Sequence, residues 1–303
     1  MNTTFRKRRG MPRAAFHIML LPAVILILIY SYGPLAGLAI AFQDFIPANG
    51  WFGSPWIGMD NFKYVWNMPG FMQVMSNTIV IALLKIVVGI VLPICLAIML
   101  NEVKHMIFKR SVQTLVYIPY FLSWVILSGI LIDLLSPSGG LVNIVLSQFH
   151  IKPIYFLGDS GWFRFVLIAS HIWKEVGFDT IVYLAAILSI DKSLYEASAL
   201  DGAGHMNQMW HVTLPGMRPI IVLLTVLALG NVLNAGFDQI FNLYSPQVYS
   251  SSDILDTFVY RLGIEQMQYG VATAVGLFKS VISFIFISTS YYLAYKLADY
   301  RIF

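Results

Sequence analysis

The sequence predicts an all-α integral membrane protein with six transmembrane helices, and its composition gives the first two reasons. Apolar residues make up 58% of the 303 positions and charged residues only 11%, and the mean hydropathy is +0.74. A soluble domain carries about 25% charged residues, so this chain lacks the charge to cover a water-soluble globule. This excludes a cytosolic enzyme and a secreted binding module. The one cysteine, Cys95, lies in an apolar run and excludes a disulfide scaffold.

The third reason is a set of six segments long enough to cross a bilayer, which takes about 20 mostly apolar residues. We expect spans at about 14–43, 77–100, 111–132, 165–190, 219–237 and 271–297, in one transmembrane domain that covers 14–297. Charged residues interrupt three of them: Lys85 in the second, Lys174, Glu175 and Asp179 in the fourth, and Lys279 in the sixth.

Lysine and arginine outside the spans predict the orientation. With the N-terminus inside, the inner segments hold Arg6, Lys7, Arg8, Arg9, Arg13, Lys104, Lys109, Arg110, Lys192, Arg218, Lys296 and Arg301, and the outer segments hold Lys63, Lys152, Arg164 and Arg261. Cytoplasmic segments carry the excess of positive charge. We therefore expect both ends of the chain, the basic 1–13 and the short 298–303, to lie in the cytoplasm.

The outer segment 44–75 is rich in aromatic residues, among them Trp51, Trp56, Phe62 and Trp66. Amphipathic rings commonly form a belt at the depth of the lipid headgroups. The same residues would also suit a docking surface for an outside partner. Composition favours the belt over the docking surface, and both remain open.

Sequence motifs of bond-making chemistry are missing. The chain has no G-x-x-x-x-G-K-[ST], no H-E-x-x-H and no G-x-S-x-G, and its six histidines are dispersed. We expect no catalytic residue, no metal and no bound cofactor, and nothing in the charge pattern points to nucleic acid.

Polar residues inside the spans form a candidate translocation path. They are Lys174, Glu175, Asp179, Asn231, Asn234, Asp238 and Gln239. A charged residue at a helix centre costs about 2.5–3.5 kcal/mol on insertion scales, so we expect these groups to pair or to face water. Glu175 and Asp179 share a helix face, with Lys85 or Lys279 as a possible cation. Spacings of three and four would put Asn231, Asn234 and Asp238 on one face. Ion pairing between helices and a path for a hydroxyl-rich cargo both fit.

The inner loop 191–218 decides between classes of function. Its apolar residues recur at helical spacing, and Gly202 and Gly204 interrupt them, so we expect two short helices with a bend. Met206, Met209 and Trp210 form an apolar stripe. Bare apolar surface in the cytosol calls for a protein partner, or for contact with the membrane surface or the chain's own bundle.

This loop resembles the EAA signature of permeases from binding-protein-dependent ABC importers. That pattern is E-A-A, three residues, G, nine residues, and I-x-L-P. Here Glu196-Ala197-Ser198 is followed by Gly202 and then by Val212-Thr213-Leu214-Pro215, with every spacing kept. The departures are Ser198 for alanine and Val212 for isoleucine. Segment 54–62 is similar to the outer segment of the sugar-importing branch, and segment 236–246 resembles permeases for complex oligosaccharides, of the lipoprotein-associated and polygalacturonan or rhamnogalacturonan type.

The resemblance implies a multi-pass type I importer permease in the bacterial cell membrane. Such a subunit pairs with a second, homologous permease. A cytoplasmic ATPase dimer binds the ATP, and an extracytoplasmic solute-binding protein delivers the cargo, here an oligosaccharide. The loop would be the coupling helix, with Glu196, Ala197, Ser198, Asp201, Gly202, Ala203, Leu214 and Pro215 at the ATPase. Alternatives are a polyol or glycerol-phosphate cargo, a self-sufficient proton-coupled transporter, and an intramembrane enzyme that uses Glu175 and Asp179.

Overall fold

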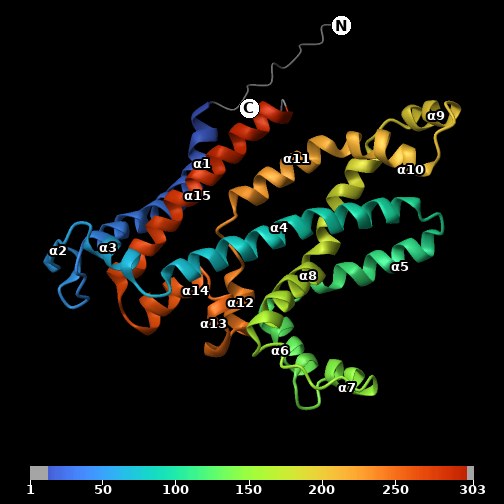
Figure 1. Cartoon of the computed structure of the whole chain (residues 1–303). Helices are drawn as coiled ribbons and strands as arrows, with labels where there is room; N and C mark the ends of the chain where they lie inside the picture. The colour runs from blue at the N-terminus through green and yellow to red at the C-terminus, as the bar shows by residue number, and fades with distance from the viewer. Residues whose placement is uncertain (1–12, 299–303) are drawn as a thin grey trace, which may run out of the picture.

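The computed structural model describes residues 13–298, and all of their regular secondary structure is helical (Figure 1). The α-helices are α1 (Arg13–Ile27), α2 (Gly50–Gly53), α3 (Asp60–Asn67), α4 (Phe71–Glu102), α5 (Met106–Tyr117), α6 (Trp124–Leu135), α7 (Leu141–Gln148), α8 (Ser160–Leu188), α9 (Lys192–Leu200), α10 (His205–Gln208), α11 (Leu214–Gly230), α12 (Phe237–Leu243), α13 (Tyr249–Ser252), α14 (Leu255–Tyr260) and α15 (Tyr269–Ala298). Short π or 3₁₀ segments are η1 (Leu28–Tyr32), η2 (Gly33–Phe42), η3 (Ile118–Phe121), η4 (Met209–Thr213), η5 (Pro246–Val248) and η6 (Arg261–Glu265). The expected terminal segments 1–13 and 298–303 lie almost wholly outside the described residues.

Within the described residues, four helices are long and apolar enough to cross a membrane: His17–Phe42, Phe71–Glu102, His205–Gly230 and Tyr269–Tyr292. A fifth crossing is possible if Met106–Phe121 and Trp124–Leu135 count as one bent span. The remaining long helix, α8, has 29 residues but carries the charges of the expected fourth span. Helical architecture is thus confirmed, whereas the count of six and the cytoplasmic ends stay predictions.

The expected third span, 111–132, is not one straight helix in the structure. The two helices on either side of the break at residues 122–123 are bent by 105°. Pro119 lies in η3 just before the break, where its ring fixes φ and removes a backbone donor. The Ser123 hydroxyl then accepts a hydrogen bond from the backbone N–H of Ile126 at 3.3 Å and begins α6 as its N-cap.

The fifth span also ends earlier than expected, because α11 stops at Gly230 and the next helix begins only at Phe237. Gly236 joins them with φ +96°, a left-handed conformation that glycine adopts without strain. Asn231 and Asn234 lie in this connection and Asp238 lies on α12. They therefore do not share a face of one helix, and that expectation is wrong.

The helices pack around the crossing of α4 and α8, which make the most extensive contact between two helices of residues 13–298. A central apolar cluster joins them to α6 and α12, through Ile81, Leu127, Phe163, Leu167 and Ile240. On its other side α8 approaches α5 so closely that only glycine fits. A Cβ added at Gly177 would lie 2.2 Å from the backbone oxygen of Val116. This contact fixes α8 against the bent helix pair.

The two ends of α4 carry different surfaces (Figure 1). Helices α9 and α10 project at the end where α4 finishes, and His205 Nδ1 lies 3.6 Å from Glu102 Oε2 there. Helix α3 and the short α2 lie at the other end, just before Phe71. A helix of 32 residues at about 1.5 Å per residue separates the two surfaces by roughly 48 Å.

Candidate functional site

The first candidate site is the surface of α9 and α10. Asp191 begins α9 as its N-cap, since its carboxylate accepts a hydrogen bond from the Ser193 backbone N–H at 2.9 Å. The bonds from Ser193 hold the pKa of Asp191 below its ordinary value. Gly202 has φ +80° and makes the bend after α9. The expectation of two short helices with a bend is therefore confirmed, with one difference: α10 runs on through η4 into α11.

Some residues of the EAA-like pattern are exposed and others are half-buried. Glu196, Ala197, Asp201, Gly202 and Pro215 are exposed, and Ser198, Ala203 and Leu214 are half-buried. Leu194, Leu200, Met206 and Trp210 add exposed apolar side chains to the same projection. Within the described residues, Glu196 has no ion pair or side-chain hydrogen bond, so its carboxylate is free to meet another chain.

Ser198, the departure from the EAA pattern, has a specific structural role. Its hydroxyl donates to the backbone oxygen of Tyr195 at 2.8 Å and accepts from Gln208 Nε2 at 3.1 Å. Gln208 Nε2 also donates to the Tyr195 backbone oxygen at 3.3 Å, and the Tyr195 hydroxyl lies 3.0 Å from Thr213 Oγ1. These bonds connect α9 to α10 and η4. An alanine at position 198 would make neither of the two bonds of the Ser198 hydroxyl.

We predict that Gln208→Ala loosens α9 without unfolding the chain. Each lost hydrogen bond contributes about 1 kcal/mol, which corresponds to a roughly fivefold change in an opening equilibrium. Gln208→Ala removes two such bonds, so hydrogen–deuterium exchange of the α9 amides should rise by about five- to thirtyfold. Asn207→Ala, at an exposed neighbour, is the control and should leave exchange unchanged. Equal exchange in both variants would show that this brace does not hold α9.

The second candidate site is a cavity of about 280 Å³ between α4, α8, α11 and the connection after α11. Its lining includes Asp179, Asn231 and Asn234 of the expected path, together with Lys85, His171 and Tyr183. These groups supply hydrogen-bond donors and acceptors in an otherwise apolar wall. Asn234 also lines a second hollow of about 730 Å³, with Tyr260, Tyr269, Asp256 and Lys279. Polar groups thus converge on Asn234 from both sides.

Lys85 and Gln239 form the buried support of the cavity wall. Lys85 is 5% exposed, and its amino group donates to the Ala235 backbone oxygen at 2.7 Å and to Gln239 Oε1. Gln239 is fully buried and donates in turn to the Leu167 backbone oxygen at 2.7 Å and to Ser170 Oγ at 2.8 Å. Gln239 therefore connects α4, α8 and α12 behind the cavity and does not line it.

The other expected path residues lie elsewhere. Lys174 donates to the Tyr120 backbone oxygen at 2.6 Å, where η3 ends, and lies 4.0 Å from Glu175 Oε1. Its amino group also stands 5.1 Å from the centre of the Tyr120 ring, within cation–π distance. Asp238 is exposed and lines neither hollow. Lys279, one expected partner of the carboxylates, pairs instead with Asp256.

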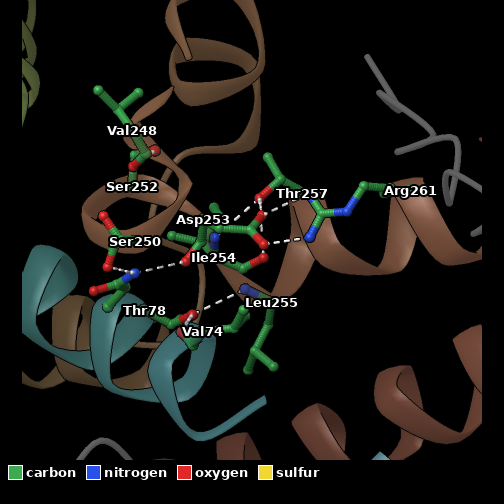
Figure 2. A network of polar contacts seen from close by, with 11 residues as sticks. Val74, Thr78, Val248, Ser250, Ser252, Asp253, Ile254, Leu255, Thr257 and Arg261 are labelled. Atoms are coloured by element: carbon green, nitrogen blue, oxygen red, sulfur yellow. Dashed lines mark hydrogen bonds and ion pairs between the residues drawn. The ribbon is translucent and has the colours of Figure 1, made fainter. Parts of the chain in front are cut away.

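A polar network that sequence reasoning missed fastens the segment before α14 to α4 (Figure 2). The buried Asp253 carboxylate takes a hydrogen bond from Thr257 Oγ1 at 2.7 Å and a two-point ion pair from Arg261. Burial alone would lower the pKa of Arg261, but the bonds and charge of Asp253 raise it. Thr78 of α4 accepts from the Leu255 backbone N–H at 2.9 Å. Arg261 entered the sequence argument only as an outer cation, because no local pattern pairs it with Asp253.

The sequence of the chain is similar to a family of transport proteins and to individual permeases. The model of the family described as binding-protein-dependent transport system inner membrane component matches residues 89–303. The polygalacturonan/rhamnogalacturonan transport system permease protein YteP of Bacillus subtilis strain 168 is 41% identical over 283 residues, which cover 93% of this chain and 88% of YteP. Protein LplB of the same strain is 40% identical over 280 residues, which cover 92% of this chain and 88% of LplB.

Solved structures give the same result for the fold. A chain in the crystal structure of a bacterial ABC transporter involved in the import of the acidic polysaccharide alginate is 39% identical and has a TM-score of 0.88. The similarity covers 94% of this chain and 96% of that chain. A second structure of the bacterial alginate transporter, in complex with an alginate pentasaccharide-bound periplasmic protein, gives a TM-score of 0.87. The chain belongs to the family of binding-protein-dependent transport system inner membrane components.

Proposed function

We propose that this chain is the permease subunit of an ATP-driven importer in the bacterial plasma membrane and that its cargo is an acidic oligosaccharide. It works with a second homologous permease, an ATPase dimer that binds the ATP, and an extracytoplasmic binding protein. The relatives named above include a permease for polygalacturonan and rhamnogalacturonan and an importer of alginate. The observation that carries the acidic cargo is the presence of N–H donors from Lys85 and His171 in the lining of the central cavity, beside Asp179.

The exposed face of α9 is the proposed docking surface for the ATPase. Glu196 supplies an unpaired carboxylate there, and Leu194, Leu200 and Trp210 supply exposed apolar area. Closure of the ATPase pair would move α9, and the brace through Ser198 and Gln208 would pass this movement to η4 and α11. The transition is then a rigid-body change between inward-facing and outward-facing states.

Cargo moves past the groups that converge on Asn234. Asn231, Asn234 and Asp179 offer donors and acceptors to hydroxyl groups, and Lys85 and His171 offer donors to carboxylates. The amino group of Lys85 has three donors, two of which already have partners. The third has no hydrogen-bond partner within the described residues, and we propose that it donates to a carboxylate of the cargo.

Uptake by the complete importer in proteoliposomes that contain ATP tests this cargo. We predict transport of an oligogalacturonide and at least tenfold slower transport of the same oligosaccharide after reduction of its carboxyl groups. Hydrogen bonds to charged groups contribute about 1.5–3 kcal/mol, and 1.4 kcal/mol corresponds to about tenfold. Equal transport of the two sugars would contradict an acidic cargo, and uptake without ATP would contradict the importer.

A further inference from the structure

A polar pocket of about 470 Å³ lies at the end of α4 opposite the coupling helices. The end of η2, helix α3 and the turn that leads into α15 form its walls. Its polar lining consists of Gln43, Asp44, Asp60, Asn61, Tyr64, Gln268 and Tyr269. In the expected orientation this outer pocket faces away from the cytoplasm. Tyr269 also lines the second hollow described above, and the other lining residues belong neither to the path nor to the coupling surface.

The outer pocket offers acceptors that have no donors. Gln43 is 6% exposed, and its Nε2 donates to the Trp51 backbone oxygen at 2.8 Å, which leaves its buried Oε1 without a partner. The buried Oε1 of Gln268 is also without a partner. Asp44 adds an exposed carboxylate that makes no ion pair within the described residues, whereas the Asp60 carboxylate is held by Lys63 at 2.8 Å. Buried acceptors left without donors are costly, so this pocket calls for a donor from outside the chain.

The pocket is rigidly built. Asn61 Nδ2 donates to the backbone oxygens of Ala41 at 2.9 Å and Gln43 at 3.0 Å. A Cβ at Gly270 would lie 2.7 Å from the Gln43 backbone oxygen and 2.8 Å from Asn61 Nδ2, so α15 meets η2 at a point that admits only glycine. Met267, with φ +57°, turns the chain into this junction. These contacts fix the backbone of the walls, so only rotation of the side chains can bring the unpartnered oxygens to a donor.

Exposed aromatic and apolar side chains surround the outer pocket. Trp51, Phe52, Trp56, Met59 and Tyr64 are all exposed, and Phe52 is fully so. A headgroup-depth belt would account for the rings but not for a pocket of unpartnered acceptors between them. Aromatic residues and arginine are enriched in protein interfaces, and the guanidinium group carries five N–H donors and no acceptor. A pocket lined by hydrogen-bond acceptors and surrounded by aromatic rings is suited to bind a cationic side chain of another protein.

We infer that the outer pocket receives an arginine or lysine side chain of the extracytoplasmic solute-binding protein when that protein docks. This inference rests on the proposed function, because it requires such a partner. The cation would lie against Asp44, a side-chain rotation of Gln43 or Gln268 would turn its buried Oε1 toward the cation, and the exposed rings would cover its stem. The aromatic segment 44–75 is then a docking surface in its central part.

Titration of the reconstituted importer with cargo-loaded binding protein tests the inference, with stimulated ATPase activity as the readout. Asp44→Arg should raise the half-saturating concentration of binding protein by more than tenfold and Asp44→Asn by about tenfold, because an opposing or missing charge weakens encounter and docking. Basal and maximal ATPase rates should not change. Glu265→Gln, at an exposed outer acid that does not line the pocket, is the matched control and should titrate like the unmodified protein.

The outcomes separate the two proposals. If binding protein does not stimulate the unmodified importer, the proposed function fails. If it does stimulate it but Asp44→Arg titrates normally, only the outer pocket inference fails. A shift that follows the lipid composition or the free cargo concentration instead of the binding protein would also overturn the inference. Restored half-saturation when Asp44→Arg is combined with an Arg→Asp or Lys→Asp change on the binding protein would identify the inserted residue.

Discussion

Gly177→Ala is expected to prevent stable packing of α8 against α5 and to cause a large loss of stability. The new Cβ would lie 2.2 Å from the Val116 backbone oxygen and 2.7 Å from the Val116 carbonyl carbon, and 3.0 Å from the Tyr117 ring. A backbone oxygen has no alternative rotamer, so one helix must move. Overpacked cores lose about 1–3 kcal/mol and sometimes more, and the upper end applies here.

Thermal unfolding of the detergent-purified importer measures this effect. We expect the midpoint to fall by roughly 5–10 °C, or the yield of assembled protein to collapse. Gly129→Ala is the matched control, because Gly129 lies inside α6 and a Cβ there would meet nothing within 4 Å. Its midpoint should stay the same or rise slightly, since alanine favours a helix over glycine by about 1 kcal/mol. Equal midpoints for the two variants would contradict the close approach of α8 and α5.

Glu196→Lys is expected to abolish assembly with the ATPase while the permease itself stays folded. Glu196 is exposed on α9 and makes no contact within the described residues that the change would remove. Reversing its charge therefore affects the binding of the ATPase and not the fold of the permease. Like charges that meet at an interface cost several kcal/mol. Co-purification of the ATPase should fall by more than tenfold, and ATP-driven uptake should fall with it.

Two further variants make this result specific. Glu196→Gln removes the charge but keeps the shape and should give an intermediate loss. Glu265→Lys makes the same reversal at the far end of the molecule and should leave ATPase binding intact. Full ATPase binding and transport by Glu196→Lys would contradict the assignment of α9 as the coupling surface.

The sequence predicted those structural features that depend on residues a few positions apart in the chain. The bend at Gly202 follows from residues within a few positions of it. The Asp191 cap is equally local, because the carboxylate and the Ser193 N–H are neighbours in the chain. The spacing of the EAA-like pattern identified the same projection that the structure places at the end of α4.

Tertiary contacts decided what the sequence could not predict. The helical spacing of Asn231, Asn234 and Asp238 favoured a continuing helix, yet the chain leaves the helix at Gly230. Lys85, 150 residues away in the sequence, binds the Ala235 backbone oxygen in the connection. The charge at Lys85 was visible as an interruption, but a backbone oxygen is a partner that no side-chain pattern shows. The acceptors of the outer pocket likewise come together only when distant segments pack, because Gln43 and Gln268 lie at opposite ends of the chain.

The most direct test of the central claim is purification of the tagged chain from its native membrane in mild detergent, with mass spectrometry of the proteins that remain bound. We predict recovery of an ATPase and a second permease in fixed proportion to the chain, and their loss from the Glu196→Lys sample. Recovery of this chain alone, in a monodisperse and folded form, would contradict an ABC permease subunit and favour a self-sufficient proton-coupled transporter.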